Sequence, residues 1–145
     1  MALINTTGLH HVRLTVTDLA RSRAFYEEIL GLEVAVQSPG DPNDPVVRQD
    51  PAQLYGGVIY QTNGILFGLR PVASGDAFDS ERPGLDHVSF AVASRDVLDA
   101  AASALEGQSI THGQVTDLAD FGIAILSFSD PDGVHLELTA PLPGQ

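Results

Sequence analysis

The chain has 145 residues, of which 43% are hydrophobic, and a formal net charge of −12. This length and hydrophobic content allow a buried core, whereas so negative a chain lacks the basic surface that nucleic acids and anionic membranes require. The sequence has no cysteine, which excludes disulfides, thiolate metal ligands and cysteine nucleophiles.

The N-terminus has no basic region followed by an apolar run, and no stretch approaches the roughly 20 apolar residues that span a bilayer. We therefore expect neither a signal peptide nor a membrane span. Together with the absence of cysteine, this favours a cytoplasmic protein.

The beginning of the chain predicts a strand, a helix and a second strand. Residues 8–16 alternate between apolar and polar positions, as a β-strand does. Asp18 can then cap a helix, and Gly31 can end it in a left-handed conformation. Residues 32–37 alternate again and predict the second strand.

Residues 38–57 contain four prolines and form a long predicted loop. A loop of this length is either a lid or binding loop or an ordinary solvent-exposed excursion, and the sequence is equally compatible with both. Beyond it, residues 58–61 and 65–70 flank Asn63-Gly64, which is a strong hairpin signal.

The second half repeats this order. Its predicted elements are a strand at 84–92, a helix from Ser94 to Gly107, a strand at 110–115, and a hairpin formed by 123–129 and 134–139. The sequence therefore predicts an α+β fold in which two paired βαβββ modules form a curved mixed sheet, with helices outside and polar strand faces inside. We expect one domain over residues 1–145, with module one at about 8–71, a linker at 72–83 and module two at about 84–140.

A duplicated pattern places two histidines at equivalent points. Residues 8–16 read Gly-Leu-His-His-Val-Arg-Leu-Thr-Val, and residues 84–92 read Gly-Leu-Asp-His-Val-Ser-Phe-Ala-Val. Because successive side chains of a strand point to opposite faces, His11 and His87 both lie on the more polar face. His10 points the other way and is interpreted as structural.

Glu137 is the third candidate metal ligand. It stands between two leucines in the last predicted strand, where a carboxylate is costly to bury unless it is paired or bound to a metal. His11, His87 and Glu137 make a set of two histidines and one carboxylate, which suits Fe(II) with open positions; Mn(II), Co(II), Ni(II) or Zn(II) would also fit. Each residue alone could instead be a hydrogen-bonded or solvent-facing side chain.

Two arginines are candidates for substrate binding. Arg13 lies two residues beyond His11 on the same face, and Arg70 lies two beyond Gly68. Both could bind an anionic group through bidentate hydrogen bonds. A salt bridge at the rim with one of the many acidic residues explains them equally well.

Tyr60 and His112, each on a predicted strand, are candidate acid–base groups in catalysis. His135 shares a strand face with Glu137, so it either supports the metal site or faces solvent. When the two predicted hairpins are aligned at Asn63-Gly64 and Asp132-Gly133, Gly68 is the counterpart of Glu137. A fourth, symmetry-related ligand is therefore missing.

The whole pattern resembles the vicinal oxygen chelate superfamily, which includes glyoxalase I, methylmalonyl-CoA epimerase, fosfomycin-resistance enzymes, bleomycin-binding proteins and extradiol dioxygenases. The resemblance covers about residues 8–140. Its motifs are Gly8-Leu9-His10-His11-Val12, Asp18, Phe25-Tyr26, Leu30-Gly31-Leu32, Gly84-Leu85-Asp86-His87-Val88, Asp130-Pro131-Asp132-Gly133 and Glu137.

This resemblance implies paired βαβββ modules with a divalent metal in the cavity between them, held by the first and last strands of each module. His11, His87 and Glu137 match that ligand pattern, and Gly68 does not. Glyoxalase I and the epimerase resemble a four-ligand pattern, so the glycine argues against both activities. Extradiol dioxygenases use His, His and Glu, which this chain matches, and the fosfomycin enzymes resemble the same three-ligand pattern.

The expected function is therefore that of a metal-dependent enzyme that binds a small, anionic substrate through neighbouring oxygens, with an extradiol-type dioxygenase as the leading reaction. The alternatives are a glyoxalase-like lyase or isomerase, and a resistance protein that binds a small-molecule drug without turnover. The resemblance also implies a homodimer, in which a site can be shared between two chains.

Overall fold

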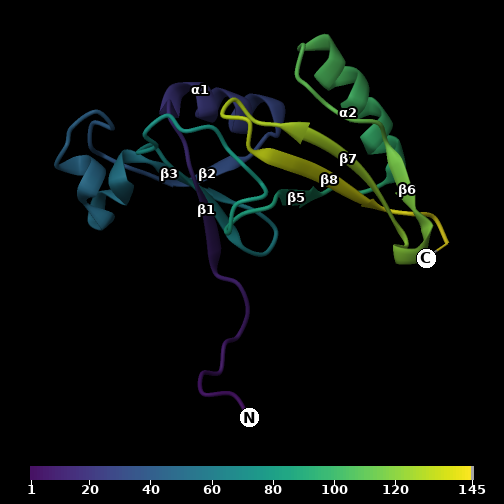
Figure 1. The fold of residues 1–145 in the computed structure, drawn as a ribbon, viewed down its shortest axis with the longest axis horizontal. Helices are drawn as coiled ribbons and strands as arrows, with labels where there is room; N and C mark the ends of the chain where they lie inside the picture. The colour runs from purple at the N-terminus through teal and green to yellow at the C-terminus, as the bar shows by residue number, and fades with distance from the viewer. Residues whose placement is uncertain (145) are drawn as a thin grey trace. The chain divides into compact units, whose positions relative to one another are not determined.

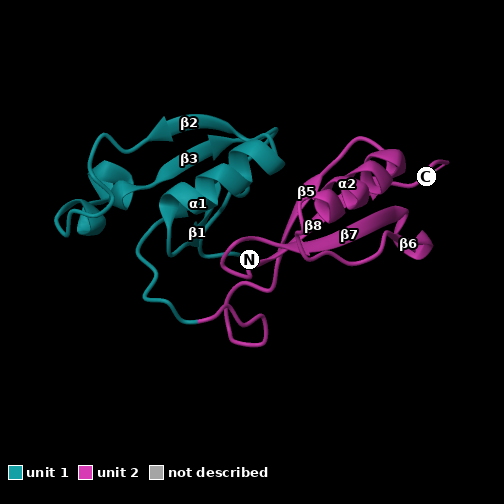
Figure 2. Ribbon diagram, turned by 90° about the horizontal axis from the view of Figure 1, so that it is seen from above, with its two compact units in different colours: residues 1–76 teal, residues 77–145 magenta. Residues whose placement is uncertain are grey.

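The computed structural model describes residues 1–144. They form two compact units, Met1–Asp76 and the segment from Ala77 onward, which Figure 2 shows in different colours. The boundary falls inside the segment 72–83 that the sequence indicates as a linker. Each unit is described by itself.

The first unit is a four-stranded mixed sheet with a helical layer on one face (Figure 1). Its strands lie in the order β1-β4-β3-β2, and β1 runs parallel to β4. Its elements are β1 (His11–Thr15), α1 (Leu19–Ala24), the π-helical turn η1 (Phe25–Ile29), β2 (Glu33–Gln37), the 3₁₀ turns η2 (Val47–Gln49) and η3 (Pro51–Gly56), β3 (Val58–Gln61) and β4 (Leu66–Arg70).

Local chemistry begins and ends the helical segment of this unit where the sequence predicts. The Asp18 side chain accepts a hydrogen bond from the backbone N–H of Arg21, which satisfies one of the free donors of α1. Gly31 has φ +66° and ends the segment. Tyr26 is fully buried, and its ring lies 5.3 Å from that of Phe67 on β4, so η1 packs against the sheet.

The second unit repeats this architecture. Its elements are β5 (Val88–Ala91), α2 (Arg95–Gly107), β6 (Thr116–Leu118), the 3₁₀ turn η4 (Ala119–Phe121), β7 (Ile123–Ser129) and β8 (His135–Pro141). The strand order is β5-β8-β7-β6, with β5 parallel to β8. Buried side chains of α2, among them Leu98 and Leu105, pack on the face of β7 and β8 that carries Leu126, Leu136 and Leu138. The α+β class and the two four-stranded modules of the form βαβββ are confirmed.

The predicted strand at 110–115 is wrong. The second strand of this unit along the chain is β6, which begins at Thr116, and within 110–115 only His112 forms a single bridge, with Phe128. The reason lies in the helix end: Ser109 has φ +56°, and the N–H of Ile110 donates to the carbonyl of Leu105. The start of the segment therefore caps α2 and does not join the sheet.

Strand registers are equivalent in the two units and leave the same face uncovered by the helix. Arg13 pairs with Gly68 across β1 and β4, and Ser89 pairs with Glu137 across β5 and β8. Because Arg13 and Ser89 each lie two residues beyond the repeated histidine, Gly68 and Glu137 occupy equivalent positions. The hairpin alignment made from sequence is thus correct.

Residues 1–144 contain no helix with the length and apolar character needed to cross a membrane.

Candidate functional site

His87 and Glu137 lie next to each other on the helix-free face of the second sheet. The Nε2 atom of His87 is 3.7 Å from Oε1 of Glu137, and the side chain of Glu137 is 17% exposed. Two atoms bound to one ion at about 2.1 Å and at a right angle would lie about 3.0 Å apart. Small side-chain rotations would therefore bring this pair into the geometry of two ligands of one metal.

Asp86 sets the orientation of the His87 ring. Its Oδ1 atom is 2.5 Å from Nδ1 of His87, so Nδ1 carries the proton and donates it to the carboxylate. The lone pair is then on Nε2, the atom that faces Glu137. A carboxylate behind a histidine is the usual support of a metal-binding imidazole, and the sequence reasoning missed it.

Glu137 has a polar environment without a permanent positive charge. Its Oε1 atom accepts a hydrogen bond of 3.2 Å from the hydroxyl of Thr139, which is itself hydrogen-bonded to Ser89. The nearest side chain that could carry a positive charge is His87. A largely buried carboxylate of this kind is costly without a cation, so the donor set fits a divalent metal.

His11 shows the same local arrangement in the first unit. It is exposed at the start of β1, and its Nδ1 atom lies 2.8 Å from Nδ1 of His10. In the tautomer in which Nδ1 of His11 donates to His10, the Nε2 atom of His11 carries the lone pair that can bind a metal. Gly8 and Gly84 each lie three residues ahead of a repeated histidine and have similar φ values, +142° and +140°. The backbone therefore bends in the same way before both histidines.

Within residues 1–144 no three His, Asp or Glu side chains are grouped as a complete metal site. The structure brings together His87 and Glu137, and His11 lies in the other unit.

A pocket of about 410 Å³ adjoins the His87–Glu137 pair. It is lined by residues that include His87, Ser127, Ser129, His135 and Glu137 from the sheet and His112 from the segment before β6. The ring of His135 contacts that of Phe78 edge-on, with the centroids 5.1 Å apart. The pocket is large enough for a small organic molecule and mostly polar at its sheet wall.

His112 lies at the rim of this pocket and is held by two acceptors. Its Nδ1 atom is 2.7 Å from the carbonyl of Gly113, and its Nε2 atom is 2.7 Å from a carboxylate oxygen of Glu106. The Gly113 carbonyl, followed by Glu106, raises the pKa of His112 above its ordinary value, because both acceptors favour the doubly protonated ring. It can donate a proton, and it can accept one only after a contact is broken.

Tyr60 lies on the other face of its sheet. Its side chain is fully buried beneath the helical layer, and its hydroxyl donates a hydrogen bond of 2.8 Å to Glu27. Burial, followed by the hydrogen bond to Glu27, raises its pKa well above the ordinary range. The phenol is therefore separated by the sheet from the face that carries His11 and Arg13.

Arg13 lies flat on the open face of the first sheet. Its Nη2 atom donates to the carbonyls of Leu54 and Leu69, at 3.0 and 2.9 Å. Burial, followed by the nearby charge of Arg70, lowers its pKa. The guanidinium crosses Gly57 and Gly68, whose missing side chains leave the room it occupies.

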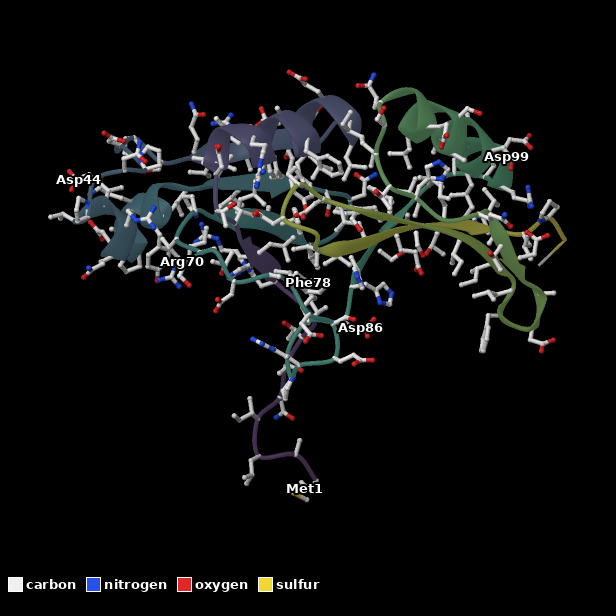
Figure 3. All side chains as sticks on the ribbon, turned by 45° about the horizontal axis from the view of Figure 1, so that its top comes forward. Met1, Asp44, Arg70, Phe78, Asp86 and Asp99 are labelled. Carbon is white, nitrogen blue, oxygen red and sulfur yellow. The ribbon has the colours of Figure 1, made fainter. Side chains whose placement is uncertain are left out.

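Arg70 lies at the end of β4, beside the segment that carries η2 and η3 (Figure 3). Its guanidinium carbon is 3.8 Å from the ring centroid of Tyr55, and that of Arg13 is 5.5 Å from the same ring. The two candidate arginines are thus brought together by a residue that the sequence reasoning did not single out. The long loop is an ordered layer over this part of the sheet.

The Glyoxalase/Bleomycin resistance protein/Dioxygenase superfamily matches the chain over residues 8–138. The chain belongs to this superfamily. The resemblance seen in the sequence is confirmed, since this is the vicinal oxygen chelate superfamily.

Several known proteins are similar to almost the full chain. The Escherichia coli (strain K12) protein named "Uncharacterized protein YaeR" is 29% identical over 142 residues, which cover 94% of this chain and 98% of that protein. The crystal structure of a glyoxylase/bleomycin resistance protein/dioxygenase domain from Frankia sp. EAN1pec is 30% identical, with a TM-score of 0.73 and coverage of 97% and 96%. A lactoylglutathione lyase from Agrobacterium tumefaciens is 18% identical, with a TM-score of 0.65 and coverage of 93% and 94%, a likeness of fold alone.

Members of the vicinal oxygen chelate superfamily bind small molecules, and enzymes are among them. In this member, the polar strand faces carry the histidines, Glu137 and the arginines. Asp86, His10 and Tyr55 were missed because their roles depend on contacts. For Asp86 and His10 a signal did exist, since each directly precedes a repeated histidine.

Proposed function

We propose that this chain is a metal-dependent enzyme that binds a small substrate through two neighbouring oxygens. His11, His87 and Glu137 would hold a divalent cation, with Fe(II) favoured by the two-histidine, one-carboxylate donor set and Mn, Co, Ni or Zn as alternatives. Bound there, the metal would polarise the substrate oxygens and hold them in place.

One observation carries this proposal: the Nε2 atom of His87, oriented by Asp86, lies 3.7 Å from the carboxylate of Glu137, which pairs with no arginine in the described part of the chain. The ring nitrogen that faces Glu137 and the oxygens of Glu137 are both atoms that bind divalent metals. Asp86 supplies the carboxylate that commonly supports a metal-binding histidine.

The other residues of the pocket would position the substrate. His112, whose pKa is raised by the Gly113 carbonyl and by Glu106, would donate a proton to a developing anion. Ser127 and Ser129 add hydroxyl groups to the wall that holds Glu137. Tyr60, proposed from sequence as an acid–base group, would act only through Glu27, because its hydroxyl is bonded there.

The leading reaction is an extradiol-type oxygenation of a small aromatic or enolic substrate. A glyoxalase-like lyase reaction is the second candidate, supported by superfamily membership and weakened by Gly68, which stands where a fourth ligand would be. Drug binding without turnover is the third, and the net charge of −12 would suit a cationic drug. A homodimeric state and a cytoplasmic location remain predictions from the sequence; light scattering of the purified protein tests the first.

Metal analysis of protein purified without chelators tests the proposal. We expect about one divalent ion per chain. This ion should be lost in His87→Ala and Glu137→Gln but retained in Glu81→Gln, which makes the same chemical change at an exposed position. Absence of metal from every preparation, including protein reconstituted with each of the five ions, would overturn it.

Activity assays separate the candidate reactions. With Fe(II) loaded, oxygen uptake in the presence of a panel of catechols supports the dioxygenase. Turnover of a hemithioacetal without oxygen uptake supports the lyase instead. Tight binding of a basic ligand by metal-free protein, with neither reaction, supports the binding protein.

A further inference from the structure

Arg13 and Arg70 carry charge that no carboxylate neutralises. Among the described residues, the other arginines include Arg23, Arg82 and Arg95, which form ion pairs with Glu27, Asp79, and Asp99 and Asp117. Arg13 and Arg70 have no such pair within residues 1–144, although the chain has 19 acidic residues. The rim salt bridge that the sequence allowed is therefore not formed.

The acidic residues of the adjacent loop are engaged with their own backbone. Asp41, Asp44 and Asp50 accept hydrogen bonds from the N–H groups of Asn43, Val46 and Ala52. These contacts hold the turns of the segment 38–57. They also keep its carboxylates away from the two guanidinium groups, so the positive charge remains available.

The two arginines also have unused donors. The Nε atoms of both are buried without a hydrogen-bond partner. A buried donor without an acceptor is uncommon and requires an explanation, of which a ligand is one. Both guanidinium groups lie against the ring of Tyr55, and an anion bound between these two like charges would relieve their repulsion.

The loop holds Tyr55 over the pair by a strained backbone. Leu54 and Tyr55 have φ values of +53° and +56°, a left-handed conformation that is uncommon for residues other than glycine, Asn or Asp. This bend directs the Leu54 carbonyl to Arg13 and the Tyr55 ring to both guanidinium groups. Strain of this kind clusters at ligand-binding segments.

The two arginines therefore have different tasks. Arg13 is fixed by two backbone carbonyls, and it holds the loop in place. Arg70 lies over the ring of Tyr55, and within residues 1–144 its Nε atom has no hydrogen-bond acceptor. Arg13 follows His11 by two residues on the same face of β1, about 7 Å along the strand.

We propose that Arg70, with Arg13 and the stacked ring of Tyr55, forms a site for the oxyanion of the substrate, a carboxylate or a phosphonate. The inference rests on the proposed function and deepens it: it assigns to the enzyme a substrate that carries an anionic group in addition to its metal-binding oxygens. The site lies within the first unit, so it can be tested without metal.

The test is a titration of chelator-treated protein with acetate and with methylphosphonate, which lack vicinal oxygens, followed through the NMR signals of the arginine Nε–H groups. We expect saturable shifts at Arg70 and Arg13 with a Kd of about 1–10 mM, since so small a ligand contributes little binding energy. Acetamide, the neutral analogue of acetate, should give none. The stronger of the two anions identifies the substrate as a carboxylate or a phosphonate.

Variants sharpen this test. Arg70→Gln should weaken anion binding at least tenfold, and Arg70→Lys should weaken it by less. Arg82→Gln is the control: it removes an equal charge from an ion-paired position and should leave anion binding unchanged. Equal binding by Arg70→Gln and wild type, or no saturable shift with either anion, would overturn the inference. The anion titration uses metal-free protein, so it is independent of the metal analysis. If the protein binds anions but never binds metal, the proposed function is refuted and this inference stands. If it binds metal but no anion, only this inference is refuted.

Discussion

The side chain of Arg13 fills the place where a side chain on Gly68 would begin. A Cβ atom on Gly68 would lie 3.1 Å from Cγ and Nε of Arg13 and 2.6 Å from Cδ1 of Ile59. The equivalent position of the second unit holds Glu137. The two units therefore differ at this position. The second sheet presents the carboxylate of Glu137, whereas in the first sheet the side chain of Arg13 lies over Gly68.

Alanine substitutions test how closely Arg13 is packed. Gly68→Ala should lower the free energy of unfolding by about 1–2 kcal/mol, because the Ile59 side chain must move. Gly57→Ala should cost about 3 kcal/mol or more, because its Cβ would lie 1.9 Å from the carbonyl oxygen of Leu69. Gly107, with no atom near its Cβ position, is the control. Urea unfolding measures all three, and a smaller loss for Gly57→Ala than for Gly68→Ala would contradict this packing.

Asp86→Ala should weaken metal binding without removing it. The carboxylate holds the proton on Nδ1 of His87, and loss of such a support typically costs 10–100-fold in metal affinity. The metal affinity of Asp86→Asn should lie between those of Asp86→Ala and wild type, since the amide oxygen can still accept the hydrogen bond from Nδ1. Competition with a chelating dye measures the affinity, and Asp76→Asn, at an exposed position, controls for the charge. Unchanged affinity in Asp86→Ala would remove Asp86 from the site.

Tyr60→Phe should affect stability and leave metal binding intact. The buried hydroxyl donates to Glu27, which also pairs with Arg23 at 2.6 Å. Loss of a hydrogen bond to a charged acceptor costs about 1.5–3 kcal/mol, and the partial exposure of Glu27 places the expected value near the lower end. Denaturant unfolding and metal analysis on the same sample check this. Loss of activity at full stability and metal content would instead support the acid–base role suggested by sequence.

The sequence predicted the fold well because its signals were local and duplicated. The hairpin at Asn63-Gly64, the cap at Asp18 and the repeated histidine pattern each correspond to an observed feature. The prediction of a strand at 110–115 was wrong because the N–H group of Ile110 caps α2. The alternation of apolar and polar side chains does not encode this contact.

The site was only partly predictable for a related reason. Periodicity placed His87 and Glu137 on one face, and the structure puts their reactive atoms 3.7 Å apart. Periodicity could not show that Tyr60 faces the helical layer, because a strand has two faces and the pattern of 58–61 is apolar on both. Nor could it show that a strained loop brings Tyr55 onto Arg70, since left-handed Leu54 and Tyr55 have no sequence signature.

The contact between His112 and Glu106 should make stability depend on pH. The pKa of His112 is raised in the folded state, so the stabilisation is complete below the ordinary value of 6.5 and is lost as the pH rises through the folded pKa. Glu106→Gln should therefore be less stable than wild type at about pH 5.5 and equal to it at about pH 9.

NMR titration of the His112 ring checks the same contact directly. The pKa should be highest in wild type and lower in Glu106→Gln, yet still above its ordinary value in the variant, because the carbonyl of Gly113 is the larger cause of the shift. Glu81→Gln, which removes an exposed carboxylate elsewhere in the second unit, should change neither stability nor the pKa. A wild-type pKa at or below 6.5 would show that His112 is neutral and free to act as a base in the pocket.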